Sequence, residues 1–285
     1  MKNKIIIGTA QLVQNYGISN FSNKNKKKDV FKILNYCYEN NLKKFDTSPY
    51  YKNQKLIGSF VKKNGINDIK ISSKIPSLKG KSNKLIYIKK NIDNILNELN
   101  VDYLDNLYFH DYNDIKFIND NFDQIKKIVF QYKINSLGVS IYTPNHFEKI
   151  KKNSIIKSVQ VPLNILNREF EKKNSNRIKK ISRSVFLQGL LINKKINTKN
   201  KYLNSFHHSY FKILEELNIN PYNLCLDYIS NCKDFHSHVI GFENIKQIKK
   251  IVDYFPGKSH LKLIDVLEKK IKYKKKSTVI DPRKW

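Results

Sequence analysis

Apolar residues recur along the chain in short continuous runs that alternate with longer stretches of helical spacing. IIIGTA at residues 5–10 is an unbroken apolar run with β-branched residues, which is typical of a strand buried on both faces. In VFKILNYCYENN, residues 30–41, the apolar positions fall three and four apart, which predicts an amphipathic helix. This alternation continues to about residue 255.

The alternation predicts eight strands separated by helices. The predicted strands occupy residues 5–10, 43–48, 68–74, 103–110, 136–141, 158–164, 182–191 and 239–242. The predicted helices occupy residues 30–41, 54–64, 85–100, 123–134, 145–153, 206–218, 221–231 and 243–255, so that two helices separate the last two strands. Eight such strands favour a closed parallel barrel over an open sheet.

One barrel accounts for the length of the chain, because a (β/α)8 TIM barrel needs about 250 residues. The sequence therefore predicts an α/β protein with a single barrel domain over residues 1–285 and a basic tail from about residue 256. The tail ends in KKIKYKKKSTVIDPRKW, which we interpret as exposed chain, with a disordered arm or a membrane-surface patch as alternatives. We expect Trp285, the only tryptophan, to anchor the tail on the outside of the barrel, with a place in a pocket wall as the alternative.

The formal charge of +30 raises the question of a nucleic-acid partner. Of the 54 basic residues, however, only four are arginine, at positions 168, 177, 183 and 283. Nucleic-acid surfaces exploit the planar guanidinium group, whereas this lysine excess accompanies abundant asparagine and isoleucine. We therefore interpret most of the charge as solvated helix faces and predict no specific nucleic-acid partner.

The chain has no run of 18 apolar residues and no cleavage-like site near its start, so we expect a cytoplasmic protein with no membrane partner. The three cysteines, Cys37, Cys225 and Cys232, lack metal-like spacing, and reduced thiols are the expectation. His236 and His238 lie two apart on a presumed strand and would face the same side. With no third ligand near them, the sequence predicts no metal site.

Polar residues that could take part in catalysis lie at or just after the ends of three successive predicted strands. Asp46 ends one apolar run and precedes Tyr50 and Tyr51, while Lys74 and His110 end the next two. In a parallel barrel the carboxyl ends of the strands carry the active site, so these side chains are expected to meet there.

This set resembles the active site of the aldo-keto reductases, a family in which an Asp, a Tyr five residues later, a Lys and a His surround a nicotinamide cofactor. The match falls on Asp46, Tyr51, Lys74 and His110. Other segments that look like the family are IIIGTAQ (5–11), LGVS (137–140), QVPLN (160–164), SVFLQGLL (184–191) and VIG (239–241), so the resemblance covers roughly residues 4–254. The resemblance implies an oxidoreductase that uses NADP or NAD to reduce a carbonyl compound.

The four residues suit the chemistry of carbonyl reduction, which needs a hydride donor and a proton donor to the oxygen. Tyr51 would give the proton, and we expect the Lys74 ammonium to lower the pKa of its phenol. Asp46 would hold Lys74 in place, and His110 would orient the substrate carbonyl. Tyr50 is expected at the substrate mouth. The alternatives are a Lys74 that snorkels from the rim and a His110 satisfied by Asp111 in the core.

For the cofactor, the resemblance implies two groups of contacts. Those near the nicotinamide are Ser140, Gln160, Asn164 and Arg183, and those near the phosphate or adenosine end are Gly241, Glu243, Asn244 and Gln247. A helix beginning after the last strand suits a phosphate physically. The sequence contains no GxGxxG fingerprint, so a Rossmann dinucleotide site has no support.

The chain departs from the family pattern at three positions. Lys52 replaces the glycine expected after Tyr51, Ile141 replaces an asparagine after Ser140, and Arg183 occupies the place of an aromatic that stacks on the nicotinamide. The guanidinium of Arg183 could stack in the same way or meet an anionic group, and the alternative is a structural arginine satisfied by carbonyls of the barrel rim. These departures leave open a catalytically weak, nicotinamide-binding barrel that acts as a sensor or a partner-binding subunit. The favoured partner is a small carbonyl or sugar substrate. Relatives that carry a segment like RSVFLQGLL suggest surface-sugar metabolism and a nucleotide-linked sugar.

Overall fold

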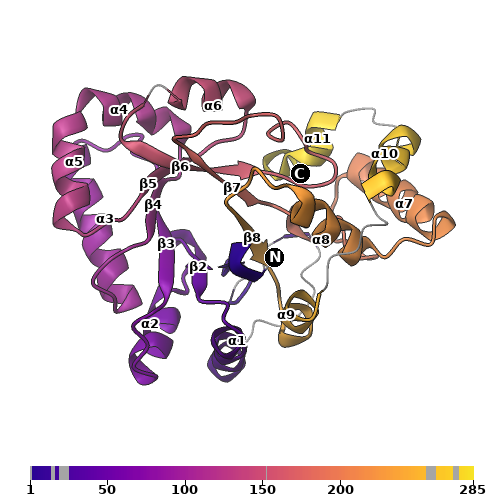
Figure 1. Cartoon of the computed structure of the whole chain (residues 1–285), viewed down its shortest axis with the longest axis horizontal. Helices are drawn as coiled ribbons and strands as arrows, with labels where there is room; N and C mark the ends of the chain where they lie inside the picture. Colours follow the sequence, from indigo (N-terminus) through magenta and orange to yellow (C-terminus); the bar gives the residue numbers. More distant parts are fainter. Residues whose placement is uncertain (1, 14–16, 19–25, 152, 255–260, 272–275) are drawn as a thin grey trace.

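Eight parallel strands close into a barrel in which neighbours in sequence are neighbours in the sheet (Figure 1). The computed structural model describes residues 2–13, 17–18, 26–151, 153–254, 261–271 and 276–285. The strands are β1 (Ile5–Gly8), β2 (Lys44–Asp46), β3 (Lys70–Ile75), β4 (Asn106–Phe109), β5 (Leu137–Ser140), β6 (Ile156–Pro162), β7 (Lys179–Arg183) and β8 (Ser237–Gly241). β8 pairs with β1, which closes the barrel and confirms the predicted fold class.

Helices surround the barrel and lie between consecutive strands, except between β6 and β7, which a segment without a helix connects (Figure 1). The α-helices are α1 (Lys27–Glu39), α2 (Gln54–Lys63), α3 (Lys84–Leu99), α4 (Ile115–Asp120), α5 (Phe122–Gln131), α6 (Pro144–Ile150), α7 (Lys201–Glu216), α8 (Pro221–Asn231), α9 (Ile245–Val252), α10 (Leu261–Lys270) and α11 (Lys276–Ile280). The short 3-10 helices are η1 (Lys2–Lys4), η2 (Pro49–Tyr51), η3 (Tyr112–Asp114), η4 (Leu187–Gly189) and η5 (Pro282–Lys284). The two helices predicted between the last two strands are present as α7 and α8.

Helix α3 shows how the sequence sets these elements. The Asn83 side chain caps its first turn by accepting a hydrogen bond from the Ile86 N–H, and Asn100 ends it in a left-handed conformation with φ +54°. Its buried residues recur three and four apart, at Ile88, Ile92, Ile95 and Leu99. This spacing places one apolar stripe against the barrel and leaves the charged positions in solvent.

The strands are buried almost throughout, as parallel strands covered by helices must be. Every residue of β1 and β5 is buried, and β3 buries five residues after an exposed Lys70. Most of these side chains are apolar, but Asp46 and Lys74 are buried as well. A buried charge without an opposite charge beside it would be strongly destabilising, so these two side chains are expected to pair. Both lie at or near the carboxyl ends of their strands.

The seventh strand differs from the sequence prediction. It spans Lys179–Arg183, whereas the apolar run led us to place it over residues 182–191. Leu187 and Gln188 have φ values of +47° and +53°, which an extended strand does not allow. The run is buried all the same, because it folds as η4 over the end of the barrel. The apolar run therefore correctly indicated that these residues are buried, but it did not indicate whether their backbone is extended.

The C-terminal segment returns to the barrel. The indole Nε1 of Trp285 donates to the carbonyl of Thr278 at 3.0 Å, and its ring packs against the core. Trp285 is not among the residues that line the pocket described below, which favours the anchoring role. Part of the predicted basic tail, residues 255–260 and 272–275, lies outside the described residues.

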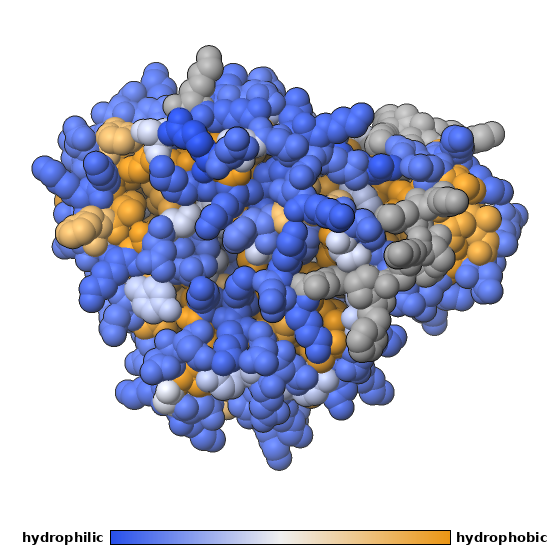
Figure 2. Space-filling view, in the orientation of Figure 1, coloured by the Kyte–Doolittle hydropathy of each residue, from blue (hydrophilic) through white to orange (hydrophobic). Residues whose placement is uncertain are grey.

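The face shown in Figure 2 is largely hydrophilic, with apolar side chains visible in gaps between polar ones. This agrees with a lysine excess carried on solvated helix faces. Among the helices of the described segments, none combines the length and the hydrophobicity that a bilayer crossing requires.

Candidate active site

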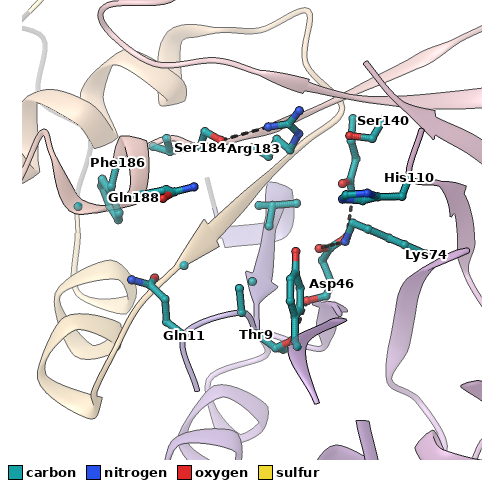
Figure 3. Close-up of a pocket in the computed structure, with 18 of the residues that line it drawn as sticks. Thr9, Gln11, Asp46, Lys74, His110, Ser140, Arg183, Ser184, Phe186 and Gln188 are labelled. Carbon is teal, nitrogen blue, oxygen red and sulfur yellow. Dashed lines mark hydrogen bonds and ion pairs between the residues drawn. The ribbon is translucent and has the colours of Figure 1, made fainter. Parts of the chain in front are cut away.

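A pocket opens at the carboxyl ends of the barrel strands (Figure 3). The strands contribute Gly8, Asp46, Lys74, Ser140, Gln160, Arg183 and Gly241 to its lining, all at or near strand ends. Tyr51, from the turn after β2, and His110, which directly follows β4, complete the predicted set. The structure therefore brings Asp46, Tyr51, Lys74 and His110 into one pocket.

Lys74 is a buried lysine whose charge is matched by Asp46. Its Nζ donates to Asp46 Oδ1 at 2.5 Å and to the carbonyl of Thr47 at 3.0 Å. The second carboxylate oxygen of Asp46 accepts a hydrogen bond from Gln160 Nε2 at 2.5 Å. Figure 3 shows Asp46 and Lys74 pointing toward each other with His110 beside them. Three strands thus fix this ion pair in place.

Tyr51 is positioned by the short turn η2. Its N–H donates to the carbonyl of Ser48 at 2.9 Å, and the Ser48 hydroxyl caps the turn. The Tyr51 ring centroid lies 5.4 Å from the Lys74 ammonium nitrogen. Tyr50, in contrast, is 52% exposed, and its ring centroid lies 5.6 Å from that of His110. Of the two adjacent tyrosines, Tyr51 is the one that lines the pocket.

The pKa of the Tyr51 phenol is raised, chiefly by burial and then by the Asp46 carboxylate, while Arg183 lowers it. The sequence predicts the opposite direction, a pKa lowered by Lys74. That prediction is wrong because burial disfavours the charged phenolate and the Asp46 carboxylate, which is paired with Lys74, adds to this effect in the resting enzyme. Tyr51 consequently keeps its proton at neutral pH, which is the state that a proton donor needs.

His110 is neutral at neutral pH. Burial lowers the pKa of its imidazole to about 4, and the positive charges of Lys74 and Arg183 act in the same direction. A neutral imidazole has one N–H donor and one acceptor nitrogen. The ring can therefore donate a hydrogen bond to a neutral carbonyl oxygen.

The alternative of a core histidine satisfied by Asp111 does not fit the structure. The Asp111 carboxylate accepts hydrogen bonds from the Ser77 hydroxyl at 3.0 Å and the Asn113 N–H at 2.9 Å. His110 itself faces the pocket, and its backbone N–H is tied to the carbonyl of Ile75 at 3.1 Å.

Arg183 ends β7 and turns into the pocket, where Figure 3 shows it next to Ser184. Its Nη1 donates to Ser184 Oγ at 3.3 Å, and its Nη2 donates to the carbonyl of Ile141 at 3.5 Å. The guanidinium carbon lies 4.2 Å from the ring centroid of Tyr142, a further lining residue. A rigid, planar cation therefore borders the same pocket as Tyr51.

A sequence model of the aldo/keto reductase family matches residues 4–266 of the chain. The chain belongs to the aldo/keto reductase family. Membership confirms the family resemblance on which the predicted enzyme class rests.

Individual relatives are more distant. Aldo-keto reductase YhdN of Bacillus subtilis (strain 168) is 24% identical over 163 residues, which cover 52% of this chain and 49% of YhdN. The match thus spans about half the length of that curated relative. Among solved structures, aldo-keto reductase AKR11C1 from Bacillus halodurans (holo form) has a TM-score of 0.70 at 19% identity, covering 96% of this chain and 94% of that one. The glycerol dehydrogenase AKR11B4 from Gluconobacter oxydans has a TM-score of 0.70 at 16% identity, covering 94% and 92%. At these identities the likeness shows a shared fold.

The first departure from the family pattern places a lysine in a backbone conformation that favours glycine. Lys52 has φ +53°, a left-handed conformation that costs a non-glycine residue about 1 kcal/mol. A glycine meets this requirement without strain, which is why a glycine is expected after the tyrosine. Ile141, the second departure, is fully buried, and its N–H donates to the carbonyl of Gln160 at 2.9 Å.

The residues predicted to bind the nicotinamide do not all reach the pocket. Ser140, Gln160 and Arg183 line it, and so does Gly241 from the second predicted group. Asn164 does not, and its side-chain atoms are engaged with the segment that follows β6 and with the residue that follows β7. Its Nδ2 donates to the carbonyl of Ser184, and its Oδ1 accepts from the N–H groups of Leu166 and Asn167.

The other three residues predicted at the phosphate or adenosine end, Glu243, Asn244 and Gln247, lie at the start of α9. Asn244 Oδ1 accepts from the Gln247 N–H at 3.1 Å, and Gln247 Oε1 accepts from the Glu243 N–H at 2.7 Å. This reciprocal pattern is a helix cap. The Glu243 carboxylate also accepts from Gln11 Nε2 at 3.4 Å. Contacts of these three side chains with a cofactor stay a prediction.

Sequence reasoning assigned no role to several lining residues, namely Thr9, Gln11, Tyr142, Ser184, Phe186 and Gln188. All of them except Tyr142 lie in two of the family-like segments, IIIGTAQ and SVFLQGLL, so the resemblance to the family could have indicated them. The residues of SVFLQGLL were missed because the segment was assigned to a strand, and a strand would not turn these side chains over the barrel mouth. Tyr142 carried no signal of its own.

The two histidines considered as a metal pair are in different environments. His238 is buried, with its Nδ1 2.8 Å from Ser182 Oγ, whereas His236 is exposed and precedes β8. Within the described part of the chain, no group of three or more His, Cys, Asp or Glu residues is arranged to hold a metal ion.

Proposed function

We propose that the protein reduces the carbonyl group of a small molecule with NADPH, or alternatively with NADH. The observation that supports this most is the meeting of Asp46, Tyr51, Lys74 and His110 in one pocket at the carboxyl ends of the strands. Lys74 is ion-paired with Asp46, and Tyr51 is protonated beside it. Membership of the aldo/keto reductase family supports the same reaction.

The residues present fit a nicotinamide cofactor, which supplies the hydride when bound. Gly8 and Gly241, which are paired between β1 and β8, line the pocket without a Cβ, so a ligand can approach the backbone closely there. Ser140 and Gln160 would hold the nicotinamide end, because both line the same pocket and carry groups that can hydrogen-bond to its amide.

Tyr51 and His110 act on the substrate oxygen. As negative charge develops there, the protonated phenol of Tyr51 donates its proton, and the neutral His110 donates a hydrogen bond that fixes the carbonyl. Lys74 stabilises the phenolate that forms, and Asp46 holds Lys74 at the required position. Catalysis then depends on protein groups already oriented before the substrate binds.

The substrate range that we infer covers aldehydes, ketones and sugars, including nucleotide-linked sugars. The structural similarity to a glycerol dehydrogenase is consistent with polyol and sugar substrates. The alternative, a nicotinamide-binding barrel without turnover, is not favoured, because all four side chains that the reaction needs are present together.

Two measurements test the proposed function. Fluorescence titration with NADPH and NADH is expected to show binding of at least one of them at sub-millimolar concentration. A panel of aldehydes, ketones and sugars is then expected to include compounds that the purified protein reduces with oxidation of the bound cofactor. Binding of neither cofactor would refute the proposed function. Cofactor binding without turnover of any carbonyl compound would support the sensor alternative.

A further inference from the structure

The pocket carries an unbalanced positive charge. Among the described residues that line it, the charged ones are Asp46, Lys74 and Arg183. Asp46 and Lys74 neutralise each other at 2.5 Å. Arg183 forms no ion pair with any carboxylate in the described part of the chain, so it leaves the pocket with a net charge of about +1.

Two of the other arginines show how the chain usually satisfies this side chain. Arg168 pairs with Glu171 at 3.1 Å and with Asp265 at 3.2 Å, and Arg283 pairs with Asp281 at 2.6 Å. A guanidinium group has five N–H donors, and within the described residues Arg183 uses them only toward Ser184 and Ile141. The donors that remain are available to a molecule in the pocket that Arg183 lines.

The guanidinium of Arg183 is held in a fixed orientation. Its carbon lies 4.2 Å from the ring centroid of Tyr142, and the carbon of Arg283 lies 3.5 Å from the same centroid. Arg283 is itself fixed by Asp281, whose two carboxylate oxygens accept from its Nε at 2.8 Å and its Nη2 at 2.6 Å. The C-terminal η5 segment and the Tyr142 ring thus preorganise Arg183, so less rotamer freedom is lost when it binds an anion.

Arg183 also acts on the two groups assigned to the substrate oxygen. Its positive charge lowers the pKa of both Tyr51 and His110. Because Arg183 lines the same pocket as Tyr51 and His110 and its charge acts on both, its guanidinium lies near the place where the substrate carbonyl would bind. An anion paired with Arg183 would therefore belong to the same small molecule as that carbonyl.

We propose that the substrate carries an anionic group, a carboxylate or a phosphate, within a few bonds of its carbonyl, and that Arg183 binds this group. The inference rests on the proposed function, because it assumes that a carbonyl oxygen lies between Tyr51 and His110. A guanidinium fork pairs with both anions through two parallel hydrogen bonds, which lysine does not provide. Arg183 would then determine specificity, while Tyr51 and His110 perform the chemistry.

Binding of matched alcohol ligands tests this inference without requiring turnover. Calorimetric titration of the full chain, with and without NADPH, compares 4-hydroxybutanoate with butan-1-ol and glycerol 3-phosphate with glycerol. For at least one pair, the anionic ligand is expected to bind the wild type roughly 10- to 100-fold more tightly than the neutral one, the range of a charge-assisted hydrogen bond.

Three variants assign the preference to one side chain. Arg183→Met is expected to abolish the preference for the anion, and Arg183→Lys to retain part of it. Arg177→Met, which removes the same charge from an exposed position on the surface, should retain it in full. Turnover of 4-oxobutanoate and butanal should follow the same order in the ratio of their kcat/KM values.

Three outcomes would overturn the inference. One is equal binding of anionic and neutral ligands by the wild type in both pairs, and another is an anion preference that survives in Arg183→Met. The third is a loss of NADPH affinity in Arg183→Met with an unchanged ligand preference, which would assign Arg183 to the cofactor. Failure of the proposed function has a different signature, an Arg183-dependent anion preference in binding together with no reduction of any carbonyl compound.

Discussion

Tyr51→Phe is expected to lower the rate of carbonyl reduction by roughly 10²-fold or more, the scale of a lost general acid. The substitution removes only the hydroxyl and keeps the ring that lies 5.4 Å from Lys74 Nζ. Because no cofactor contact is assigned to this hydroxyl, NADPH affinity should stay near that of the wild type. Steady-state kinetics on a verified substrate, together with cofactor titration, measure the two quantities separately.

Tyr50→Phe is the matched control for this experiment. Tyr50 is adjacent in sequence but half exposed beside His110, so its hydroxyl should affect mainly the KM of the substrate. Wild-type activity in Tyr51→Phe would remove Tyr51 from the chemistry. A large loss confined to Tyr50→Phe would assign the proton transfer to the neighbouring tyrosine instead.

Lys74→Met is expected to lower both activity and stability. The rate should fall about as far as in Tyr51→Phe, because the phenolate loses the cation that stabilises it. The free energy of unfolding should fall by about 3–5 kcal/mol, because Asp46 is left as a buried carboxylate without its counter-charge. Urea denaturation measures the second effect independently of any substrate.

A double variant separates the two roles of Lys74. When Asp46→Asn is combined with Lys74→Met, neither charge of the pair remains buried, and the introduced amide oxygen can still accept the hydrogen bond that Gln160 gives to Asp46. Most of the lost stability should return, whereas the activity should not. Recovery of activity along with stability would mean that Lys74 acts only through the fold.

The barrel was predictable from the sequence because its signals are local and repeated. The buried run at β1 and the three-and-four spacing of α3 follow directly from the order of apolar residues. Lys74 and His110 were found for the same reason, since each ends an apolar run and the ends of parallel strands share one face of a barrel. The bounds of β7 were missed because the run from Val185 to Leu191 is buried in a non-extended conformation.

The electrostatics of the pocket were not predictable in this way. The pKa of Tyr51 is raised and not lowered because the phenol is buried and lies near the Asp46 carboxylate, and neither its burial nor this proximity can be read from the sequence. The contact of Arg283 with Tyr142 joins residues far apart in the chain. Asn164 matched a family segment, yet its polar atoms bind the backbone of Leu166 in its own loop and of Ser184 after β7.

The central claim, hydride transfer to a carbonyl with Tyr51 as proton donor, is tested most directly with a deuterium label. Reduced cofactor carrying deuterium at both C4 positions of the nicotinamide is mixed with a carbonyl compound that the protein turns over. Mass spectrometry of the product then reports the label. The account predicts one deuterium on the former carbonyl carbon, and formation of this product roughly 10²-fold or more slowly in Tyr51→Phe. Unlabelled product, or labelled product formed equally fast by both proteins, would contradict it.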